Sequence, residues 1–427
     1  MRTSFDVLVI GGGPSGSTVA ALLAKAGWNA ALIEQSPFPR RKVCGEYISL
    51  TNWSLLENLG LGESIQHLAG PEVSHVALLV RDAFVSAELP FARAGPLKSD
   101  HSLHCGRALT RDVLDTRLLN HARDSGVAIW QPWKALSVSR DGSKYDCILR
   151  ARDTGDQTTI SSTIIIAAQG SWESSPLQDA SRKAASDRDL FGFKAHFRHS
   201  SLPHNLMPLL SFPDGYGGMV RCQDGLTSLS CCIRRGRLSL LQRESQKSAP
   251  RQAGDHASAE PAGEQVLEHI MRTCPAILPF FKDAVREGAW LSAGPLQPGI
   301  RRRYSTNVFA VGNAAGEAHP VVAEGISMAL QSAYLLAHLL APQRGNVHDA
   351  KAMDAVGKEY SKEWGRAFGL RIRASSVIAH WAMRPAWVGA ALPLFKIWPH
   401  LLTLGAEIAG KAALPFQSSS WEKARWI

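Results

Sequence analysis

The order of apolar and polar positions near the N-terminus predicts a strand, a helix and a second strand. Residues 5–10 are almost entirely apolar, as expected for a strand buried on both faces of a parallel sheet. Residues 17–27 are rich in alanine, have apolar positions at helical spacing and end at Gly27. The apolar stretch 28–34 then ends in Glu34. We therefore expect a βαβ unit over the first segment of the chain.

Similar patterns recur further along the chain. Residues 107–127 have the spacing of an amphipathic helix, and three strand patterns follow, the last two joined by the turn sequence RDGSK at 140–144. Buried strands are predicted again at 163–168 and 307–312, each leading into a turn of small residues. A long helix is predicted at 324–341. This alternation of buried strands and helices predicts the α/β class.

The middle and the end of the chain have a different character. Mixed-face strand patterns at 191–197 and 228–235 flank the glycine-rich sequence DGYGGMV, which we expect to be flexible. Residues 244–264 are polar and rich in Ala, Gly and Pro, which favours a loop without fixed structure. The tail from residue 352 is predicted to be helical, with Trp and Arg among apolar residues. That composition suits either an interfacial helix or a capping layer on the core.

Composition narrows the class of protein. The chain has 427 residues, 45% hydrophobic and 20% charged, enough for two globular domains. The N-terminal apolar run is short and broken by glycine, so we expect a strand rather than a signal peptide. No eighteen consecutive residues are apolar, so no membrane span is expected. Seven cysteines without CxxC or zinc spacing predict reduced thiols, a cytoplasmic location and no metal site.

The net charge of +10 leaves two interpretations open. A solvated basic surface is the simpler one. An anionic membrane surface, such as the inner membrane face, or an acidic carrier protein as partner is the sharper one. The chain shows no zinc finger, RNA-binding signature or basic helix, so no nucleic-acid partner is expected.

The sequence GGGPSG directly follows the first strand and opens the first helix. In the pattern G-x-G-x-x-G, Gly11 makes the turn, Gly13 lets a pyrophosphate approach the backbone, and Gly16 permits close helix–strand packing. Pro14 and Ser15 lie in this turn, just before the predicted helix, whose N-terminus attracts phosphates. Glu34 is placed to accept hydrogen bonds from a ribose. The combination predicts dinucleotide binding, with a turn serving only packing as the alternative.

The later turn GNAAGEAHPVVAEGI, residues 312–326, resembles the fingerprint G-D-A-A-G-x-x-x-P-x-x-G-x-G of FAD-dependent oxidoreductases with the para-hydroxybenzoate hydroxylase fold. The resemblance is greatest to the branch of geranylgeranyl reductases, flavin monooxygenases and halogenases. It implies FAD as cofactor, with Gly312 and Pro320 at the site. Asn313 would contact the ribityl chain, and Gly325 and Ile326 the edge of the flavin.

Three positions depart from that family pattern. Asn313 replaces the usual Asp, Ala323 stands where Gly is usual, and Gln169 replaces the Asp of the middle A-D-G fingerprint at 168–170. An amide oxygen can still accept a hydrogen bond, but charge-assisted hydrogen bonds are roughly twice as strong as neutral ones. We therefore expect weaker retention of FAD rather than its loss.

A further set of candidates comes from the same resemblance. In RRKVCGEY, residues 40–47, Cys44 and Gly45 would lie near the flavin, and Arg41, with Arg40 as the alternative, would approach the ribityl chain or phosphates. Arg111 matches a helix start beside FAD. Gln35, next to Glu34, completes the predicted cofactor-binding set: Gly11, Gly13, Pro14, Ser15, Gly16, Glu34, Gln35, Arg41, Cys44, Gly45, Arg111, Gly312, Asn313, Pro320, Gly325 and Ile326.

Four residues are candidates for catalysis. Cys44 is either a mechanistic thiol or a small buried hydrophobe. Glu46 is either an acid or base on the substrate side or a salt-bridged carboxylate. His319 has an ordinary pKa near 6.5, which suits proton transfer at neutral pH. Tyr216, in DGYGGMV, falls where the related reductases carry an aromatic motif, so it is expected to line a substrate cavity.

The predicted architecture is a Rossmann-like FAD-binding domain (GR2 type) with a mixed β-sheet substrate domain and a C-terminal helical region. The expected boundaries are 1–75, 100–185 and 290–345 for the FAD domain, 76–99 and 186–289 for the substrate domain, and 346–427 for the helical region. No second G-x-G-x-x-G is present, which resembles members of the family that bind nicotinamide transiently or take electrons from a partner protein. NAD(P)H is therefore expected as a transient reductant.

The resemblance implies an FAD-dependent oxidoreductase of secondary metabolism. We expect monooxygenation of a lipophilic or aromatic small molecule, such as a polyketide or isoprenoid. The alternatives are reduction of a C=C bond, suggested by KVCGE, and a non-catalytic flavin-binding protein, suggested by the two lost acids. Halogenation is less favoured, because the Trp-x-Trp-x-Ile-Pro motif of flavin halogenases is missing.

Overall fold

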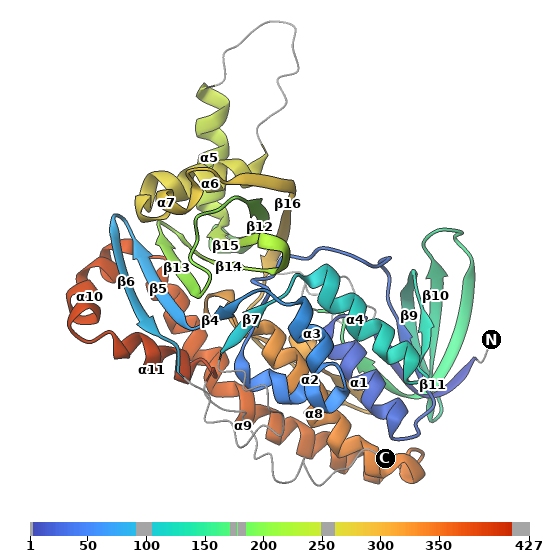
Figure 1. Ribbon diagram of the computed structural model, residues 1–427. Coiled ribbons are helices and arrows are strands. Elements are labelled where there is room, and N and C mark those ends of the chain that lie inside the picture. The colour runs from blue at the N-terminus through green and yellow to red at the C-terminus, as the bar shows by residue number, and fades with distance from the viewer. Residues whose placement is uncertain (1–2, 91–104, 171–176, 178–184, 249–260, 412–427) are drawn as a thin grey trace, which may run out of the picture.

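The computed structural model describes residues 3–90, 105–170, 177, 185–248 and 261–411, and its first sheet is built around the N-terminal strand (Figure 1). β1 (Ser4–Ile10) lies between β2 (Ala30–Ile33) and β11 (Gln157–Ala167) and runs parallel to both. β8 (Ala128–Trp130) pairs with β2, and β19 (Val308–Ala310) pairs with β11. These five strands run parallel in the order β19-β11-β1-β2-β8, within an eight-stranded sheet whose three other strands pair antiparallel.

Both faces of this sheet are covered, which explains why its strands are apolar throughout. α1 (Pro14–Lys25) packs between α4 (Arg111–Asp124) and α8 (Gly325–Leu340) on one face, where Val7 and Val9 join their core. On the other face, Leu8 and Ile10 pack under β9 (Trp133–Asp141) and β10 (Lys144–Ala151). The hairpin predicted at 140–144 joins these two strands.

The second large sheet has seven strands and is mostly antiparallel. Its order is β16 (Val285–Leu296), β12 (Leu190–Arg198), β15 (Thr227–Arg234), β14 (Gly215–Arg221), β13 (Leu206–Phe212), β5 (His75–Val80) and β6 (Ala83–Glu88). On β5, Ala77 and Leu79 face a core with α6 (Ala262–Thr273) and α7 (Leu278–Phe281), beside α5 (Arg235–Ser248). Leu78 and Val80 face the opposite side, because successive strand residues alternate between faces.

That opposite side is covered by the C-terminal helices. α9 (Ala350–Ala382) packs along α8, and α10 (Pro385–Ile397) and α11 (His400–Ile408) lie against β5 and β6 (Figure 1). Among the described residues no helix is both long and apolar enough to cross a membrane. The remaining short elements are β3 (Tyr47–Ile48), α2 (Trp53–Leu59), α3 (Gly62–Leu68), β4 (Glu72–Val73), β7 (Gly106–Ala108), β17 (Gly299–Ile300), β18 (Tyr304–Ser305) and β20 (Gly316–Glu317).

The predicted α/β class is confirmed, but three local expectations were wrong. The sequence DGYGGMV forms the regular strand β14, because it pairs with β13 on one side and β15 on the other. At Gly217 and Gly218 the strands approach so closely that a Cβ would sit 3.0 Å from Cys231 Cβ and 3.2 Å from Pro208 O. The helix predicted from residue 107 begins only at Arg111, after β7. The ends of the loop predicted at 244–264 belong to α5 and α6, and 249–260 lie outside the described residues.

The domain boundaries stay a prediction, and one of them falls inside a strand. Strands from both segments assigned to the substrate domain, 76–99 and 186–289, pair within the seven-stranded sheet. The boundary expected at residue 290 falls inside β16, which pairs with β12 over most of its length.

We predict that Trp364→Ala destabilises the whole protein. Trp364 on α9 is 1% exposed, packs on Phe368 and lies where a Cβ on Gly316 would meet its ring. Removing a buried Trp side chain costs about 3–5 kcal/mol. The urea midpoint should fall accordingly, whereas Leu370→Ala, on the same helix but 71% exposed, should leave it nearly unchanged. Equal shifts for both variants would contradict this assignment of the core.

Candidate cofactor and substrate site

The three sequence fingerprints meet at one edge of the parallel sheet. β1, β11 and β19 are adjacent and parallel, so their carboxyl ends lie together. The backbone N–H of Ala168 donates to Ile10 O at 2.8 Å, and that of Val311 donates to Ala167 O at 3.0 Å. The turns at 11–16, 168–170 and 312–326 follow these ends directly. A dinucleotide site is expected at this edge of an open α/β sheet.

The first turn needs its glycines for close backbone approach. A Cβ on Gly11, whose φ is +111°, would lie 2.5 Å from Ala168 O, and a Cβ on Gly16 would lie 1.9 Å from Gly11 O. At Gly13 the nearest atom is Arg111 Nη2 at 3.8 Å, so this position is open. The outer glycines therefore serve packing, and Gly13 leaves room beside the α1 N-terminus.

A cavity of about 1140 Å³, including its open mouth, lies over this edge and is called the cofactor cavity below. Fourteen predicted site residues line it: Gly11, Gly13, Pro14, Ser15, Glu34, Cys44, Gly45, Glu46, Arg111, Asn313, His319, Pro320, Gly325 and Ile326. Gly16 and Gly312 lie beneath its wall, where a Cβ on Gly312 would sit 2.6 Å from Ser15 Oγ. Gln35 is half-buried and does not line the cavity.

Arg41 is not placed where the resemblance put it. Its guanidinium pairs with Asp112 at 4.0 Å and with Glu287 at 3.6 Å, away from the cavity lining. Arg40 lines the cavity instead, 3.3 Å from Glu34 and 3.7 Å from Asp115. The two arginines are neighbours in the chain, so only the direction taken by the backbone decides which one reaches the cavity.

The polar groups of the cofactor cavity fit FAD. Both oxygens of Glu34 are held by backbone N–H groups, of Gly12 and Ser36, each at 2.8 Å, which fixes the carboxylate for a ribose hydroxyl. Among the described residues, the buried Arg40 Nε and Gln169 Oε1 have no hydrogen-bond partner. Arg40 offers a donor to a phosphate, and Gln169 offers an acceptor to a hydroxyl. Buried polar atoms are rarely left unpaired, so these two point to a ligand.

The neutral Asn313 has an acidic neighbour, Glu317, which no sequence pattern indicated. Asn313 Nδ2 donates to Glu317 Oε1 at 3.2 Å, and Arg301 Nη1 donates to Asn313 O at 2.6 Å. Glu317 is buried and lines the same cavity. A carboxylate is therefore present next to position 313, although it comes from the residue four positions later.

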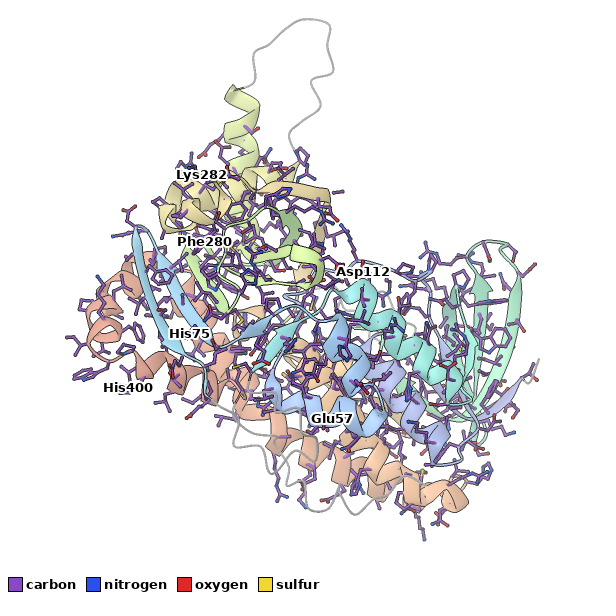
Figure 2. The ribbon with its side chains drawn as sticks, in the orientation of Figure 1. Glu57, His75, Asp112, Phe280, Lys282 and His400 are labelled. Atoms are coloured by element: carbon purple, nitrogen blue, oxygen red, sulfur yellow. The ribbon has the colours of Figure 1, made fainter. Side chains whose placement is uncertain are left out.

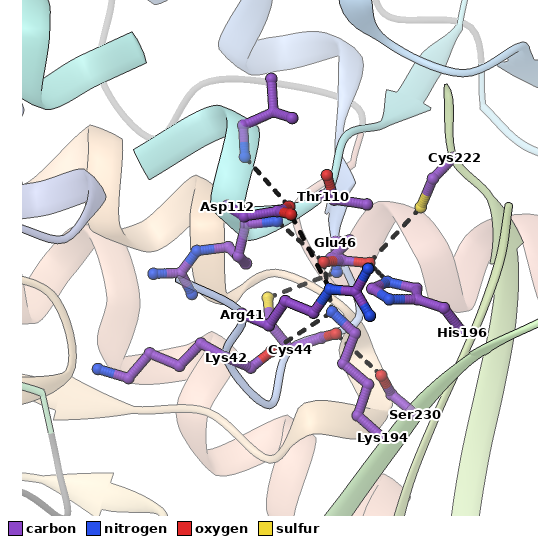
Figure 3. A network of polar contacts seen from close by, with 12 residues as sticks. Arg41, Lys42, Cys44, Glu46, Thr110, Asp112, Lys194, His196, Cys222 and Ser230 are labelled. Atoms are coloured by element: carbon purple, nitrogen blue, oxygen red, sulfur yellow. Dashed lines mark hydrogen bonds and ion pairs between the residues drawn. The ribbon is translucent and has the colours of Figure 1, made fainter. Parts of the chain in front are cut away.

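Glu46 lies at the centre of a buried ionic cluster (Figure 3). Its side chain is 1% exposed and pairs with Lys194 Nζ through Oε1 and with His196 Nε2 through Oε2 at 2.8 Å. The backbone N–H of Arg111 also donates to Oε1 at 2.9 Å. Lys194 and His196 are alternate residues of β12, so they point to the same face of the seven-stranded sheet. The cluster thus joins the loop before β3 to the other sheet.

These contacts argue against Glu46 as a general acid or base. Burial raises the pKa of Glu46, but the ion pair with Lys194 and the hydrogen bond with His196 outweigh it and lower the pKa to about 2. A carboxylate with that pKa stays ionised at neutral pH and is a weak base. The salt-bridged alternative is the one the geometry supports. Lys194 and His196 were missed, although charged residues within the apolar run FGFKAHF were a usable signal.

A second cavity, called the apolar cavity below, has a volume of about 830 Å³, including its open mouth, and lies between the seven-stranded sheet and the fingerprint turn. Its lining includes Met207, Leu209, Tyr216, Met219, Val220, Cys231, Cys232, Leu296 and Val321. It shares Val43, Cys44, Gly45, Tyr47, Asn313, Glu317, Pro320 and Ala323 with the cofactor cavity. A molecule held there would lie directly beside the cofactor.

Besides the shared residues Asn313 and Glu317, the boundary between the two cavities carries one neutral polar pair, Tyr216 and His319. Tyr216 Oη lies 3.3 Å from His319 Nδ1. Burial lowers the pKa of His319 to about 4, so the ring is neutral at neutral pH and does not have the ordinary value assumed from the sequence. Burial and the adjacent Cys232 raise the pKa of Tyr216, which also stays neutral. Both side chains therefore act as neutral hydrogen-bonding groups.

The position where the family pattern has glycine is strained in this chain. Ala323 ends the turn 320–322 with φ of +53°, in the left-handed region, and lines both cavities. A left-handed conformation costs a residue with a Cβ about 1–2 kcal/mol. Glu324, the next residue, is buried and paired with Lys411 at 2.7 Å, which holds the turn in place.

Comparison with known proteins decides the family. The model of the FAD binding domain matches residues 4–231, more than half of the chain. The chain belongs to this FAD-binding family. It is an FAD-dependent oxidoreductase, and its reductase and halogenase relatives assign an enzyme rather than a non-catalytic flavin-binding protein.

The relatives have different names and different coverage. The chain is 25% identical to conditioned medium factor receptor 1 of Dictyostelium discoideum over 413 residues, 92% of this chain and 74% of the relative. It is 33% identical to a menaquinone reductase of Mycobacterium tuberculosis over 141 residues. That match covers 33% of this chain and 32% of the relative, so the similarity extends over only part of each protein.

Solved structures of similar fold come from the same branch. The flavin-dependent brominase Bmp2 has a TM-score of 0.71 at 18% identity, covering 98% of this chain and 96% of that one. A geranylgeranyl bacteriochlorophyll reductase-like protein from Thermoplasma acidophilum has a TM-score of 0.65 at 17% identity, covering 96% and 100%. At these identities the likeness shows the fold, and the named branch of FAD-dependent oxidoreductases is confirmed.

We predict that Glu46→Gln destabilises the protein in a pH-dependent way. The change leaves Lys194 buried without its partner, which costs about 3–5 kcal/mol at pH 7. The native carboxyl has a pKa of about 2, below its unfolded value of 4.5, so its contribution is present above pH 4.5 and is lost as the pH falls. The difference in free energy of unfolding between wild type and variant, measured with urea, should therefore become smaller from pH 5 towards pH 3.

Two controls accompany this measurement. Glu63→Gln removes an exposed carboxylate and should change little at any pH. Adding Lys194→Met to Glu46→Gln should recover much of the loss, because the unpaired charge is removed. If the difference in free energy of unfolding stays constant between pH 5 and pH 3, the carboxylate charge is not what stabilises the cluster.

We also predict that restoring the family's aspartate weakens FAD binding. In Asn313→Asp a second carboxylate would lie beside Glu317, where the amide now donates a hydrogen bond. Like charges at this separation repel, so the Kd for FAD should rise by about tenfold, about 1.4 kcal/mol. Adding Glu317→Gln should restore affinity. Tighter binding by Asn313→Asp alone, in a fluorescence titration of the apoprotein, would contradict this interpretation.

Proposed function

We propose that this FAD-dependent oxidoreductase is a monooxygenase that acts on a lipophilic small molecule carrying an aromatic hydroxyl group. The observation that carries the proposal is the apolar cavity, which shares a wall with the cofactor cavity and has one neutral polar pair at the boundary. An apolar cavity with few polar groups holds a lipophilic body and orients it by a single hydrogen-bonding group.

The apolar lining supplies binding energy and excludes water. Met207, Leu209 and Met219 from the sheet and Val321 from the fingerprint turn present hydrocarbon and thioether surface. Burying apolar surface contributes roughly 25 cal/mol per Å². Exclusion of water protects reactive species from side reactions. A lipophilic polyketide or isoprenoid is the class of molecule that suits this lining.

The pair Tyr216 and His319 suits the hydroxyl of an aromatic ring. His319 is neutral at neutral pH and Tyr216 keeps its proton, so together they offer both a hydrogen-bond donor and an acceptor. They would position the ring and accept a hydrogen bond from its hydroxyl, which increases electron density on the carbon to be oxidised.

The overall reaction balances with an external reductant. One C–H bond of the substrate becomes C–OH and the other oxygen atom of O₂ leaves as water, while NAD(P)H gives a hydride, the solvent gives one proton, and NAD(P)⁺ is released. Bound FAD would supply the two-electron chemistry, held by the α1 N-terminus, Glu34, Arg40 and Gln169. The residues of this chain would bind, orient and exclude water.

Reduction of a C=C bond is the second candidate, favoured by a different observation. Cys44 lines both cavities, so its thiol lies at the border between cofactor and substrate. The partial match to menaquinone reductases points the same way. In this reaction NAD(P)H would supply a hydride equivalent to one carbon, and the Cys44 Sγ–H would supply the proton to the other before being reprotonated by solvent.

The deciding experiment compares product and oxygen uptake. Purified holoenzyme would be incubated with NADH or NADPH, bromide and chloride, and either alkylated phenols or an isoprenoid quinone, in air and without oxygen. Oxygen uptake equal to NAD(P)H consumption, with a hydroxylated product, supports monooxygenation. A saturated product formed without oxygen assigns the reductase, and a halide-dependent product assigns a halogenase.

We predict that Tyr216→Phe lowers turnover without loss of FAD. Losing one hydrogen bond to the substrate should lower kcat/KM by about tenfold, about 1.4 kcal/mol. Tyr304→Phe, half-buried and outside both cavities, is the matched control and should behave like wild type. An unchanged kcat/KM in Tyr216→Phe would show that the hydroxyl of Tyr216 does not bind the substrate.

A further inference from the structure

The outer face of the C-terminal helices exposes large apolar side chains. We call residues 370–408 the C-terminal helical layer. On α10 and just after it, Trp387 is 56% exposed, Ile397 67% and Trp398 50%. Leu404 and Ile408, four residues apart on α11, are also exposed. Large exposed apolar patches on a protein surface mark sites that interact with other proteins or with membranes.

The same layer carries an excess of positive charge. Of the four cations between residues 370 and 408, Arg373 and Lys396 are exposed, Arg384 is half-buried and Arg371 is buried, and Glu407 is the only acid. On α9, Leu370, Arg373, Val377 and His380 follow helical spacing and are all exposed. His400, at the start of α11, lies at the outer edge of the molecule (Figure 2). The exposed surface therefore combines Trp, aliphatic and basic residues.

The inner face of the layer forms part of the wall behind the apolar cavity. Leu402 and Ala406 pack in one cluster with Met207 and Leu209. Ala382 and Ala409 pack in another with Tyr216 and Val321. Met207, Leu209, Tyr216 and Val321 line the apolar cavity. A single layer of helices thus separates that cavity from the exposed Trp-rich face.

We propose that the C-terminal helical layer docks on an anionic lipid surface. Trp side chains settle at the level of lipid headgroups, aliphatic residues reach the acyl region, and Lys and Arg pair with anionic headgroups. The cations complement such a surface, and the numerous apolar residues fit lipid better than an acidic carrier protein, which would be recognised mainly by charge. The inference that docking brings a lipophilic substrate close to the apolar cavity rests on the proposed function. The inference that the layer docks on lipid is independent of that function.

The layer is also tied to the cofactor cavity at its far end. Lys411, three residues after α11, donates to Glu324 Oε1 at 2.7 Å and to Val322 O at 2.9 Å. Both acceptors flank Ala323, which lines the two cavities. The docked layer is therefore fixed to the turn that borders both cofactor and substrate.

The test is flotation of holoenzyme with lipid vesicles. Vesicles of phosphatidylcholine alone would be compared with vesicles that also contain phosphatidylglycerol. We expect wild type to float with the anionic vesicles. Trp387→Ser/Trp398→Ser should weaken that binding by about tenfold or more, and Arg373→Glu/Lys396→Glu should remove the preference for anionic lipid. FAD content, thermal stability and turnover of a detergent-solubilised substrate should stay unchanged in both.

The matched control replaces equally exposed apolar residues on the opposite side of the seven-stranded sheet. Leu240→Ser/Leu278→Ser alters α5 and α7 and should bind vesicles like wild type. The proposal is overturned if wild type stays at the bottom of the gradient with anionic vesicles, or if the Trp variant floats as well as wild type. A dimer in gel filtration that the Trp variant abolishes, without vesicle binding, would assign the face to a second copy. Binding uses no substrate, so an inactive enzyme that floats would contradict the proposed function alone.

Discussion

The close approach of backbone at the end of β1 is the constraint on which the rest of the site depends. Gly16 lies against the carbonyl of Gly11, and Gly11 lies against the carbonyl of Ala168, with no space for a side chain at either contact. This approach lets α1 begin directly beside the sheet edge, so that its N-terminal N–H groups face the cofactor cavity. The other two fingerprints reach the same edge because β11 and β19 run parallel to β1.

The second interaction that organises the molecule is the buried cluster of Glu46, Lys194 and His196. A buried ion pair contributes little net stability compared with well-packed apolar residues, but leaving one member unpaired is costly. The cluster therefore favours one arrangement of the loop at 40–47 against β12. That arrangement places Cys44 and Gly45 at the border of both cavities, where cofactor and substrate would meet. Glu46 acts by holding this loop rather than by transferring protons.

The departures from the family pattern have compensations that lie in neighbouring residues. The charge missing at Asn313 is present on Glu317, which accepts a hydrogen bond from the amide. Ala323 adopts the backbone conformation that glycine would adopt more easily, within a turn held by the ion pair of Glu324 and Lys411. Gln169 keeps a hydrogen-bond acceptor in the cavity where the family has a carboxylate. The chain thus combines the cofactor architecture of the family with a different distribution of charge.

Local pattern was sufficient for the elements and the cofactor class. The apolar runs and the glycines at 11, 13 and 16 predicted the βαβ unit, because burial on both faces and close backbone approach leave few residue types possible. The fingerprint at 312–326 placed Asn313, Pro320, Gly325 and Ile326 at the cavity that the structure contains. The α/β class followed from these segments, and FAD followed from their resemblance to the fingerprints of a known family.

Only the tertiary structure decided which polar groups meet. Arg40 and Arg41 are adjacent in sequence, and the direction of the chain places one in the cavity and the other against Glu287. The partners of Glu46 come from a strand about 150 residues away, and burial lowers the pKa of His319 to about 4. The glycines of DGYGGMV form a strand because distant segments, β13 and β15, pair with it on both sides. Contacts between distant segments, and the burial they produce, are not encoded in local spacing, which is why the sequence alone left them open.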